Sequence, residues 1–339
     1  MRGVHWQAPL VLRSARQWTF CSIQANFAHS GIPDSLIADA SGRSIPIPGG
    51  VFPLTVRSGF YELLRMNGAG NNSFRLTLLA FAVCSGSLFG DERRFAYTYE
   101  PETMLKGARE FEQWITLRSQ RSKDVGQQNF NRWELREALE YGLTDNYTIE
   151  LYLNTSAESF RDTLTGTDTS HFRFDGISLE NRYMVLNPAS HSVGLSLYLE
   201  PRFSGDEAEV EEKIILGQRY GNWKWAFNLT HATEWSENFH STEGELEASI
   251  GIARDVGKRW ALGLELRDHN ELPDYRRWEN TALFLGPVVS YRQENWWGTL
   301  SVLPQIYGAN FGEDPDGNSS LELEGHERVN VRLILGFDF

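Results

Sequence analysis

The carboxyl-terminal stretch, residues 326–339, is the part of the sequence that most restricts the fold. From Val329 onward an apolar residue stands at every second position. A period of two is typical of a β-strand whose two faces meet different surroundings. The stretch is about as long as a tilted strand needs to cross a bilayer, roughly 9–11 residues. It therefore predicts a strand with one apolar and one polar face. The apolar positions are Val329, Val331, Leu333, Leu335, Phe337 and Phe339.

The composition fits strands in a membrane better than helices. The chain has 339 residues and no apolar run of about 18 residues, so it offers no candidate transmembrane helix. A barrel needs no such run, because lipid-facing and lumen-facing residues alternate along each strand. The net charge of −13 argues against a nucleic-acid partner. Both cysteines, Cys21 and Cys84, precede residue 91, which excludes a disulfide framework or a thiol nucleophile beyond that point.

An export signal is predicted unusually deep in the chain. Residues 76–84 form a short apolar run that follows Arg75 and precedes several small residues. This is the pattern of a secretory signal peptide, with cleavage expected after Ser87 or Gly90. A buried core segment at the same place is the alternative. Lipidation at Cys84 is disfavoured, because the preceding valine is larger than the small residue expected there.

The position of this signal sets the expected organisation of the chain. Signal peptides begin at or near the amino terminus, and Met66 stands just before the apolar run. We therefore expect Met66 to lie close to the true start. A genuine extension at the amino terminus is the alternative. The predicted parts are a mis-set upstream start or disordered extension over 1–65, a signal peptide over 66–90 and a barrel over 91–339.

The alternation seen at the carboxyl terminus recurs throughout the predicted barrel. About twelve strands are expected, with ten or fourteen as alternatives, and an even number is usual for bacterial single-chain barrels. The predicted fold is an all-β, transmembrane, antiparallel up-and-down barrel. The expected strands are 109–119, 131–141, 147–154, 171–185, 192–203, 209–218, 223–234, 243–253, 259–268, 279–291, 296–307 and the stretch from Val329.

The connections predict which end of the barrel faces the periplasm. Short turns alternate with connections that are often longer, as periplasmic turns alternate with extracellular loops. Residues 155–170 and 308–326 are the expected long loops. An even strand count places both ends of the barrel sequence on the periplasmic side. For residues 95–104 the sequence leaves two alternatives, pairing into the sheet or lying in the barrel mouth.

Aromatic residues near the predicted strand ends indicate two girdles at the membrane interfaces, where amphipathic rings are favoured. Aromatic packing inside a soluble β-sandwich or barrel is the alternative, but a soluble barrel would have a polar outer face. The expected girdle residues are Tyr141, Tyr147, Trp223, Trp225, Trp260, Tyr291, Trp296, Trp297 and Tyr307.

Charged residues on the inward strand faces are the candidate functional residues. Rings of charge in a narrow lumen select ions or small solutes. In a barrel this narrow, opposite charges also pair and fill the interior, so a closed scaffold that acts through its loops is the alternative to a pore. The expected lumen-lining residues are Glu110, Glu112, Arg118, Arg132, Glu134, Arg136, Glu140, Glu150, Glu200, Lys224, Glu245, Glu247, Glu265, Arg267, Arg328 and Arg332.

Sequence motifs for catalysis and cofactors are not found. There is no Gly-x-Ser-x-Gly elbow and no His-Glu-x-x-His zinc motif. The acidic stretch 313–318 misses the spacing of a calcium-binding loop and is expected to be a solvated turn. We therefore expect neither an enzyme nor a cofactor, and a membrane-embedded hydrolase is the least favoured hypothesis.

Several stretches resemble an uncharacterised family of bacterial outer-membrane barrel proteins. They are 97–100, 106–114, 175–180, 194–201 and 284–287. The resemblance implies an outer-membrane barrel and brings no catalytic residues. The terminal aromatics Phe337 and Phe339 also resemble the signal that barrel-assembly machinery recognises. That signal often has glycine five residues before the last aromatic, where this chain has Ile334. The expected partners are therefore outer-membrane lipid and the assembly machinery.

Overall fold

The computed structural model describes residues 92–339, except 122–125, 206, 274, 276 and 312–319. The expected upstream segment, the signal peptide at 66–90 and the acidic turn at 313–318 lie outside the described residues. Among the described residues, no helix is long and apolar enough to cross a membrane.

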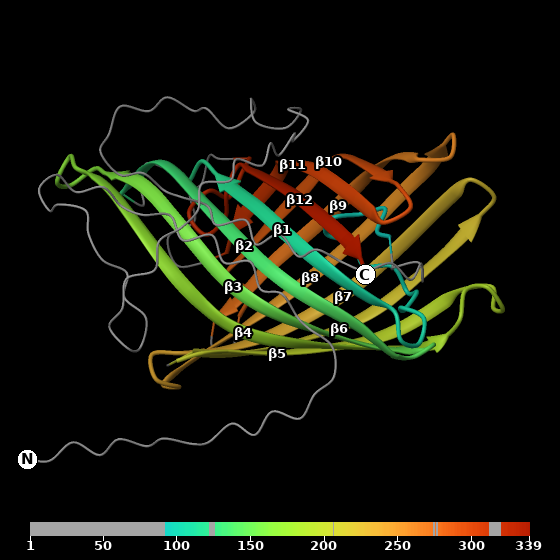
Figure 1. The fold of residues 1–339 in the computed structure, drawn as a ribbon. Coiled ribbons are helices and arrows are strands. Elements are labelled where there is room, and N and C mark those ends of the chain that lie inside the picture. The colour runs from blue at the N-terminus through green and yellow to red at the C-terminus, as the bar shows by residue number, and fades with distance from the viewer. Residues whose placement is uncertain (1–91, 122–125, 206, 274, 276, 312–319) are drawn as a thin grey trace, which may run out of the picture. The chain divides into compact units, whose positions relative to one another are not determined.

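Twelve antiparallel strands form one closed barrel, which confirms the predicted fold class and strand number (Figure 1). Neighbours in the chain are neighbours in the sheet, and β1 pairs with β12 to close it. The strands are β1 (Arg109–Ser119), β2 (Gln127–Thr144), β3 (Tyr147–Asp162), β4 (Asp168–Leu186), β5 (Gly194–Ser204), β6 (Glu207–Tyr220), β7 (Trp223–Ser236), β8 (Ser241–Val256), β9 (Trp260–Pro273), β10 (Asn280–Arg292), β11 (Trp296–Asn310) and β12 (Val329–Asp338).

The strands have apolar outer faces and polar inner faces. On β3, Leu151 and Leu153 are exposed, while the intervening Glu150, Tyr152 and Asn154 are buried. A soluble barrel would show the reverse, because its core would be apolar and its surface polar. Large exposed side chains on most strands therefore form the outer face of a membrane β-barrel.

The closing pair of strands has a continuous register. It runs from Glu110 opposite Asp338 to Ser119 opposite Val329. No sheet edge remains open between β1 and β12, as a lipid-embedded sheet requires. We call the end of the barrel where β1 begins and β12 ends the terminal end, and the other the opposite end.

The expected long loop at 155–170 is wrong. β3 continues to Asp162 and β4 begins at Asp168, so the connection spans only 163–167. Asp162 stabilises this turn, because its Oδ1 accepts the main-chain N–H groups of Leu164 (2.7 Å) and Thr165 (3.1 Å). Threonine and serine are compatible with strands, and polar side chains do not end a strand that has left the apolar zone.

Aromatic side chains gather on the outer face at the terminal end. The rings of Trp260 and Tyr291 lie 4.5 Å apart, and Tyr291 lies 5.4 Å from Trp296. Trp297, which we expected in the same girdle, is instead buried in the interior and donates its indole N–H to Glu110 (3.0 Å). Adjacent strand residues point to opposite faces, so Trp296 and Trp297 cannot both face lipid.

Candidate functional site: the lumen

Residues 92–108, which we call the lumen segment, lie inside the barrel rather than in its sheet. Arg94 contacts Asp255 at the terminal end of β8 (3.1 Å), and the main-chain N–H of Lys106 donates to Asp145 in the turn at the same end (2.9 Å). Between these points the chain is buried from residue 93 to residue 101. The segment therefore enters at the terminal end, reaches into the lumen and returns.

Glu265 on β9 holds the deepest part of the lumen segment. Its carboxylate accepts the main-chain N–H groups of Ala96 (3.1 Å), Tyr97 (2.9 Å) and Thr98 (2.9 Å). A hydroxyl of Ser301 on β11 also donates to it. Buried main-chain groups must be paired, and this single side chain replaces the ladder of hydrogen bonds that a neighbouring strand would provide.

Other inward side chains hold the remaining length of the segment. Asn228 on β7 accepts from the N–H of Tyr99 (2.6 Å) and donates to its carbonyl oxygen (2.9 Å), as a neighbouring strand would. The ammonium group of Lys224 lies 3.0 Å from both Glu100 and Glu102. Burial alone would raise the pKa of the Glu102 carboxyl, but Lys224 outweighs it and the pKa is lowered.

Glycines on the barrel wall make room for the segment. A Cβ atom at Gly251 would lie 2.5 Å from the Phe95 ring. At Gly194 and Gly217 it would lie 2.8 Å and 2.7 Å from the ring of Pro101. Real Cβ atoms do not approach other atoms so closely. The wall is therefore shaped around the lumen segment at two separate places.

Gly251→Leu is expected to push Phe95 out of its seat, because the new side chain needs the space of the ring. Limited proteolysis of the purified barrel should then cut between residues 93 and 104, where the wild type resists. Gly263→Leu does not serve as control, since its Cβ would meet main-chain atoms of β8. Ala248→Leu does, because it stands outward on the same strand. Equal resistance of Gly251→Leu and wild type would contradict the role of this glycine.

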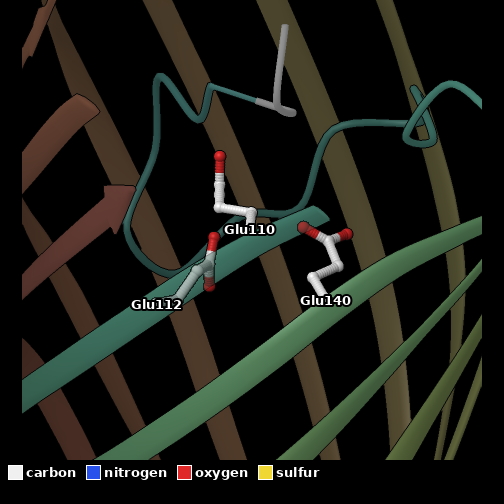
Figure 2. A group of neighbouring side chains, drawn as sticks. All are labelled: Glu110, Glu112 and Glu140. Atoms are coloured by element: carbon white, nitrogen blue, oxygen red, sulfur yellow. The ribbon is translucent and has the colours of Figure 1, made fainter. Parts of the chain in front are cut away.

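Three carboxylates meet on the inner face at the terminal end. Oxygen atoms of Glu110 and Glu112 on β1 and of Glu140 on β2 all lie within 4.8 Å of one another (Figure 2). All three side chains are buried. Arg182 on β4 pairs with Glu140 (2.5 Å) and Glu180 (3.4 Å). This region therefore concentrates carboxyl groups where water has little access.

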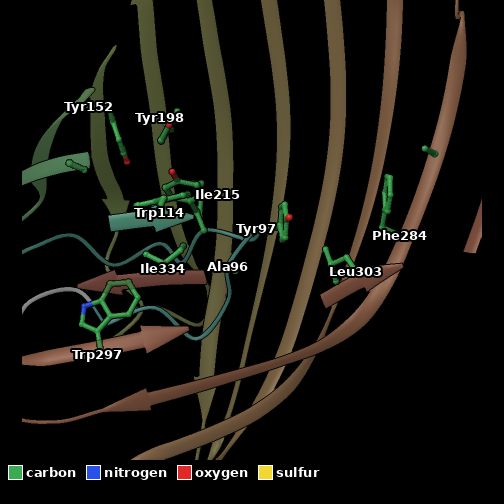
Figure 3. Close-up of a cluster of buried hydrophobic side chains, with 13 residues drawn as sticks. Ala96, Tyr97, Trp114, Tyr152, Tyr198, Ile215, Phe284, Trp297, Leu303 and Ile334 are labelled. Carbon is green, nitrogen blue, oxygen red and sulfur yellow. The ribbon is translucent and has the colours of Figure 1, made fainter. Parts of the chain in front are cut away.

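Aromatic rings surround these carboxylates inside the lumen. Trp114, Tyr152 and Tyr198 come from β1, β3 and β5 and belong to one buried cluster with Tyr99 of the lumen segment. Figure 3 shows the rings of Trp114, Tyr152 and Tyr198 gathered on one side of the interior. The Tyr152 hydroxyl donates to Glu150 (2.6 Å) or Glu180 (2.8 Å). Aromatic and acidic side chains thus share one wall.

Toward the opposite end, the interior is held by ion pairs. Glu134 lies 3.1 Å from Arg118 and 3.2 Å from Arg132, and Arg267 lies 2.6 Å from Glu247. A cavity of about 160 Å³ opens there, lined by Arg132, Ser156, Glu158, His171 and Arg173. Paired charges in a narrow interior fill space and bind one another, so this half is polar but largely occupied.

The loop before β12 also folds inward. His326 is buried, and its Nε2–H donates to the amide oxygen of Asn280 (2.8 Å). Its ring centroid lies 4.9 Å from that of His269. Burial, and then the neighbouring His269 and Arg267, lower the pKa of His326 to about 2. His326 is therefore neutral at physiological pH.

The structure places the expected lumen residues in three groups. Arg328 differs from the expectation, because it precedes β12 and is exposed. Half-buried are Arg118, Arg132, Glu134, Arg136, Glu245, Glu247 and Arg332. Buried are Glu110, Glu112, Glu140, Glu150, Glu200, Lys224, Glu265 and Arg267.

Sequence reasoning missed several inward residues and the role of the lumen segment. Glu180 and Arg182 lie in a predicted strand, but the register with β3 shifts near Gly176. A strict period of two therefore does not predict which residues of the whole strand face inward. Asn228 is uncharged, so a search for inward-facing charges does not find it. Residues 95–100 alternate like a short strand, yet they do not pair into the sheet, and only their contacts reveal where they lie.

Fold and lumen together define a membrane β-barrel that holds a segment of its own chain in its interior. The chain belongs to the Family of unknown function DUF6662, which matches residues 87–339. The resemblance to an uncharacterised barrel family is thereby confirmed. No curated protein matches the chain.

Solved barrels show a more distant likeness. The crystal structure of the COG4313 outer membrane channel from Pseudomonas putida F1 has a TM-score of 0.48 and 13% identity, covering 70% of this chain and 97% of that one. The NanC porin has a TM-score of 0.43 and 11% identity, covering 68% and 100%. The KdgM porin in complex with disordered oligogalacturonate has a TM-score of 0.41 and 7% identity, covering 68% and 99%. None is close enough to assign a substrate to this chain.

Proposed function

We propose that this protein is an outer-membrane channel or small-solute transporter, closed from the periplasmic side by its lumen segment. One observation carries the proposal: the sheet closes between β1 and β12 without using the segment. Side chains of the wall, not strand pairing, hold residues 96–99. The segment is thus able to leave without opening the sheet, and its departure would free a polar passage.

The outer face supports the membrane location. Apolar side chains such as Leu264, Ile250 and Leu229 are exposed on neighbouring strands, as contact with lipid requires. The predicted export signal is in keeping with the outer membrane of a Gram-negative bacterium. At the closing seam, the rings of Phe337 and Phe111 lie 6.5 Å apart. A role of Phe337 and Phe339 in recognition by the assembly machinery is part of the proposal.

The inner face supports conduction of small polar solutes. The residues named above as buried or half-buried in the lumen carry both signs of charge, and such a lining selects solutes by charge. A passive pore is the simplest form of this function, since no cofactor is needed. The acidic residues Glu110, Glu112 and Glu140 would form the passage nearest the terminal end.

A second candidate is a non-conducting barrel that acts through its loops. The ion pairs that span the interior near Arg118, Arg132 and Arg267 favour it. With residues 155–162 and 168–170 now assigned to strands, the loop at 163–167 and the connection after Asn310 would be the binding elements. Their deletion would then abolish partner binding and leave the barrel folded.

Single-channel recording distinguishes the two candidates. Purified wild-type barrel in planar bilayers is expected to be silent or to open rarely. A variant lacking residues 92–103 is expected to give discrete conductance steps, because the barrel wall remains and the obstruction is gone. A heat-modifiable band on electrophoresis serves as the control for folding. A folded deletion variant with no conductance above the lipid background contradicts the channel and supports the second candidate.

A further inference from the structure

The lumen segment places one cation, Arg93, deep in the acidic and aromatic part of the lumen. Its guanidinium carbon lies 3.9 Å from the ring centroid of Tyr99 and 4.6 Å from that of Trp114. The side chain is 5% exposed. Its Nε and Nη2 atoms are buried, and no hydrogen-bond partner for them occurs among the described residues. Arg93 is thus held by rings and by nearby charge rather than by direct ion pairs.

Trp114 connects Arg93 to a group of three buried carboxyl groups on the barrel wall. Trp114, on which Arg93 stacks, donates its indole N–H to Glu112 (2.5 Å). Glu112 belongs to the group with Glu110 and Glu140, and Arg182 supplies the ion pair of Glu140. One oxygen of Glu110 is buried without a hydrogen-bond partner among the described residues. A buried carboxyl oxygen without a partner favours the binding of a group that donates hydrogen bonds, such as an organic cation.

The aromatic side of this place belongs to the barrel and stays when the segment leaves. Trp114, Tyr152 and Tyr198 are strand residues. Their faces already accept cations: Arg136 lies 3.8 Å above the Tyr152 ring, and the Lys213 ammonium lies 4.5 Å from that of Tyr198. Rings combined with carboxylates suit guanidinium and ammonium groups. A small divalent metal ion instead prefers a shell of oxygen atoms alone.

We infer that Glu110, Glu112 and Glu140, together with the rings of Trp114 and Tyr152, form a binding site for an organic cation with a guanidinium or ammonium group. Arg93 covers the Trp114 side of this site while the lumen segment is in place. The inference deepens the proposed channel function, on which its meaning for transport rests, because it names the class of solute that the open lumen would favour. Binding at the site does not itself require conduction.

Chemical rescue of the full chain tests the site. Arg93→Ala removes the guanidinium and leaves a space that fits ethylguanidinium. We expect the variant to melt at a lower temperature in detergent than the wild type, and ethylguanidinium to raise its melting temperature saturably. Isothermal titration should show binding at least about tenfold tighter to the variant than to the wild type, as a desolvated contact between cation and ring allows.

The controls separate the cation site from simpler explanations. Ethylurea has the same shape without charge and should not rescue. Arg94→Ala removes the neighbouring arginine, which pairs with Glu92 and Asp255, and should not bind ethylguanidinium. Equal rescue by ethylurea, tighter binding of Mg²⁺ than of ethylguanidinium, or no difference between the two alanine variants would each overturn the inference. Arg93→Gln replaces Arg93→Ala if the latter does not fold.

Conduction is measured in a separate experiment, so that the channel function and the cation site can each be contradicted without the other. In a full-chain variant opened by Glu265→Leu, ethylguanidinium should block the current and ethylurea should not. Binding without any conductance would leave the cation site standing and remove the channel. Conductance that ethylguanidinium does not block, together with absent binding to Arg93→Ala, would leave the channel standing and remove the site.

Discussion

Glu265→Leu is expected to open the barrel. The carboxylate accepts three main-chain N–H groups of the lumen segment, from Ala96, Tyr97 and Thr98, and leucine accepts none. Each buried N–H left without an acceptor costs about 1–3 kcal/mol, and three such losses exceed what the remaining contacts of a short segment readily offset. We expect frequent conductance steps in planar bilayers and fast hydrogen exchange at residues 96–98.

Glu245→Leu is the matched control for this experiment. Glu245 is an inward carboxylate on the neighbouring β8, but it pairs with His269 (3.1 Å) instead of the lumen segment. Its replacement should leave exchange at residues 96–98 slow and the bilayer silent. If Glu265→Leu keeps the same slow exchange and the same silence as wild type, Glu265 does not hold the segment.

Ile250→Arg on the outer face is expected to destabilise the barrel in lipid strongly. Ile250 is exposed on β8 between Phe227 on β7 and Leu266 on β9, in the middle of the apolar zone. Arginine at the bilayer midplane costs about 2–4 kcal/mol in a membrane barrel. The measurement is the free energy of unfolding from phospholipid vesicles, followed by tryptophan fluorescence in a urea titration.

Val256→Arg provides the comparison at the membrane interface. Val256 ends the same strand and faces the same way, at the terminal end. An arginine is already present two residues earlier on the same face of the strand: Arg254, which lies 5.6 Å from the Trp223 ring. We expect a cost of about 0–1 kcal/mol, because the side chain reaches the headgroups. Equal costs at positions 250 and 256 would show that this face is not in contact with lipid.

The strands and their faces were predictable because they follow from local pattern. Along a strand in lipid, side chains that face lipid alternate with side chains that face the lumen. The residues of stretches such as Tyr147–Asn154 show this alternation directly. The pattern failed where lipid no longer imposes it. β3 and β4 extend beyond the predicted ends at 154 and 171, and most side chains of these extensions are threonine, serine or charged residues.

The candidate site was predictable only in part. An inward phase on β1 and β2 is enough to expect Glu110, Glu112 and Glu140 in the lumen. That these three carboxylates approach within 4.8 Å depends on the register between the two strands, in which Glu110 stands opposite Glu140. Arg93 lies outside the predicted strands, so alternation does not predict where its side chain points. Its ring neighbours Tyr99 and Trp114 are brought to it only by the fold.

The sequence by itself predicted a barrel of about twelve strands with an apolar outside and a charged inside, because alternation acts between residues two positions apart. Where residues 92–108 lie was decided only by the tertiary structure. The contacts that hold this segment in the lumen join Ala96, Tyr97 and Thr98 to Glu265, across 167 to 169 residues, and Tyr99 to Asn228, across 129. Local alternation in the sequence does not predict these contacts, because they form only once the closed sheet has brought the side chains into one lumen.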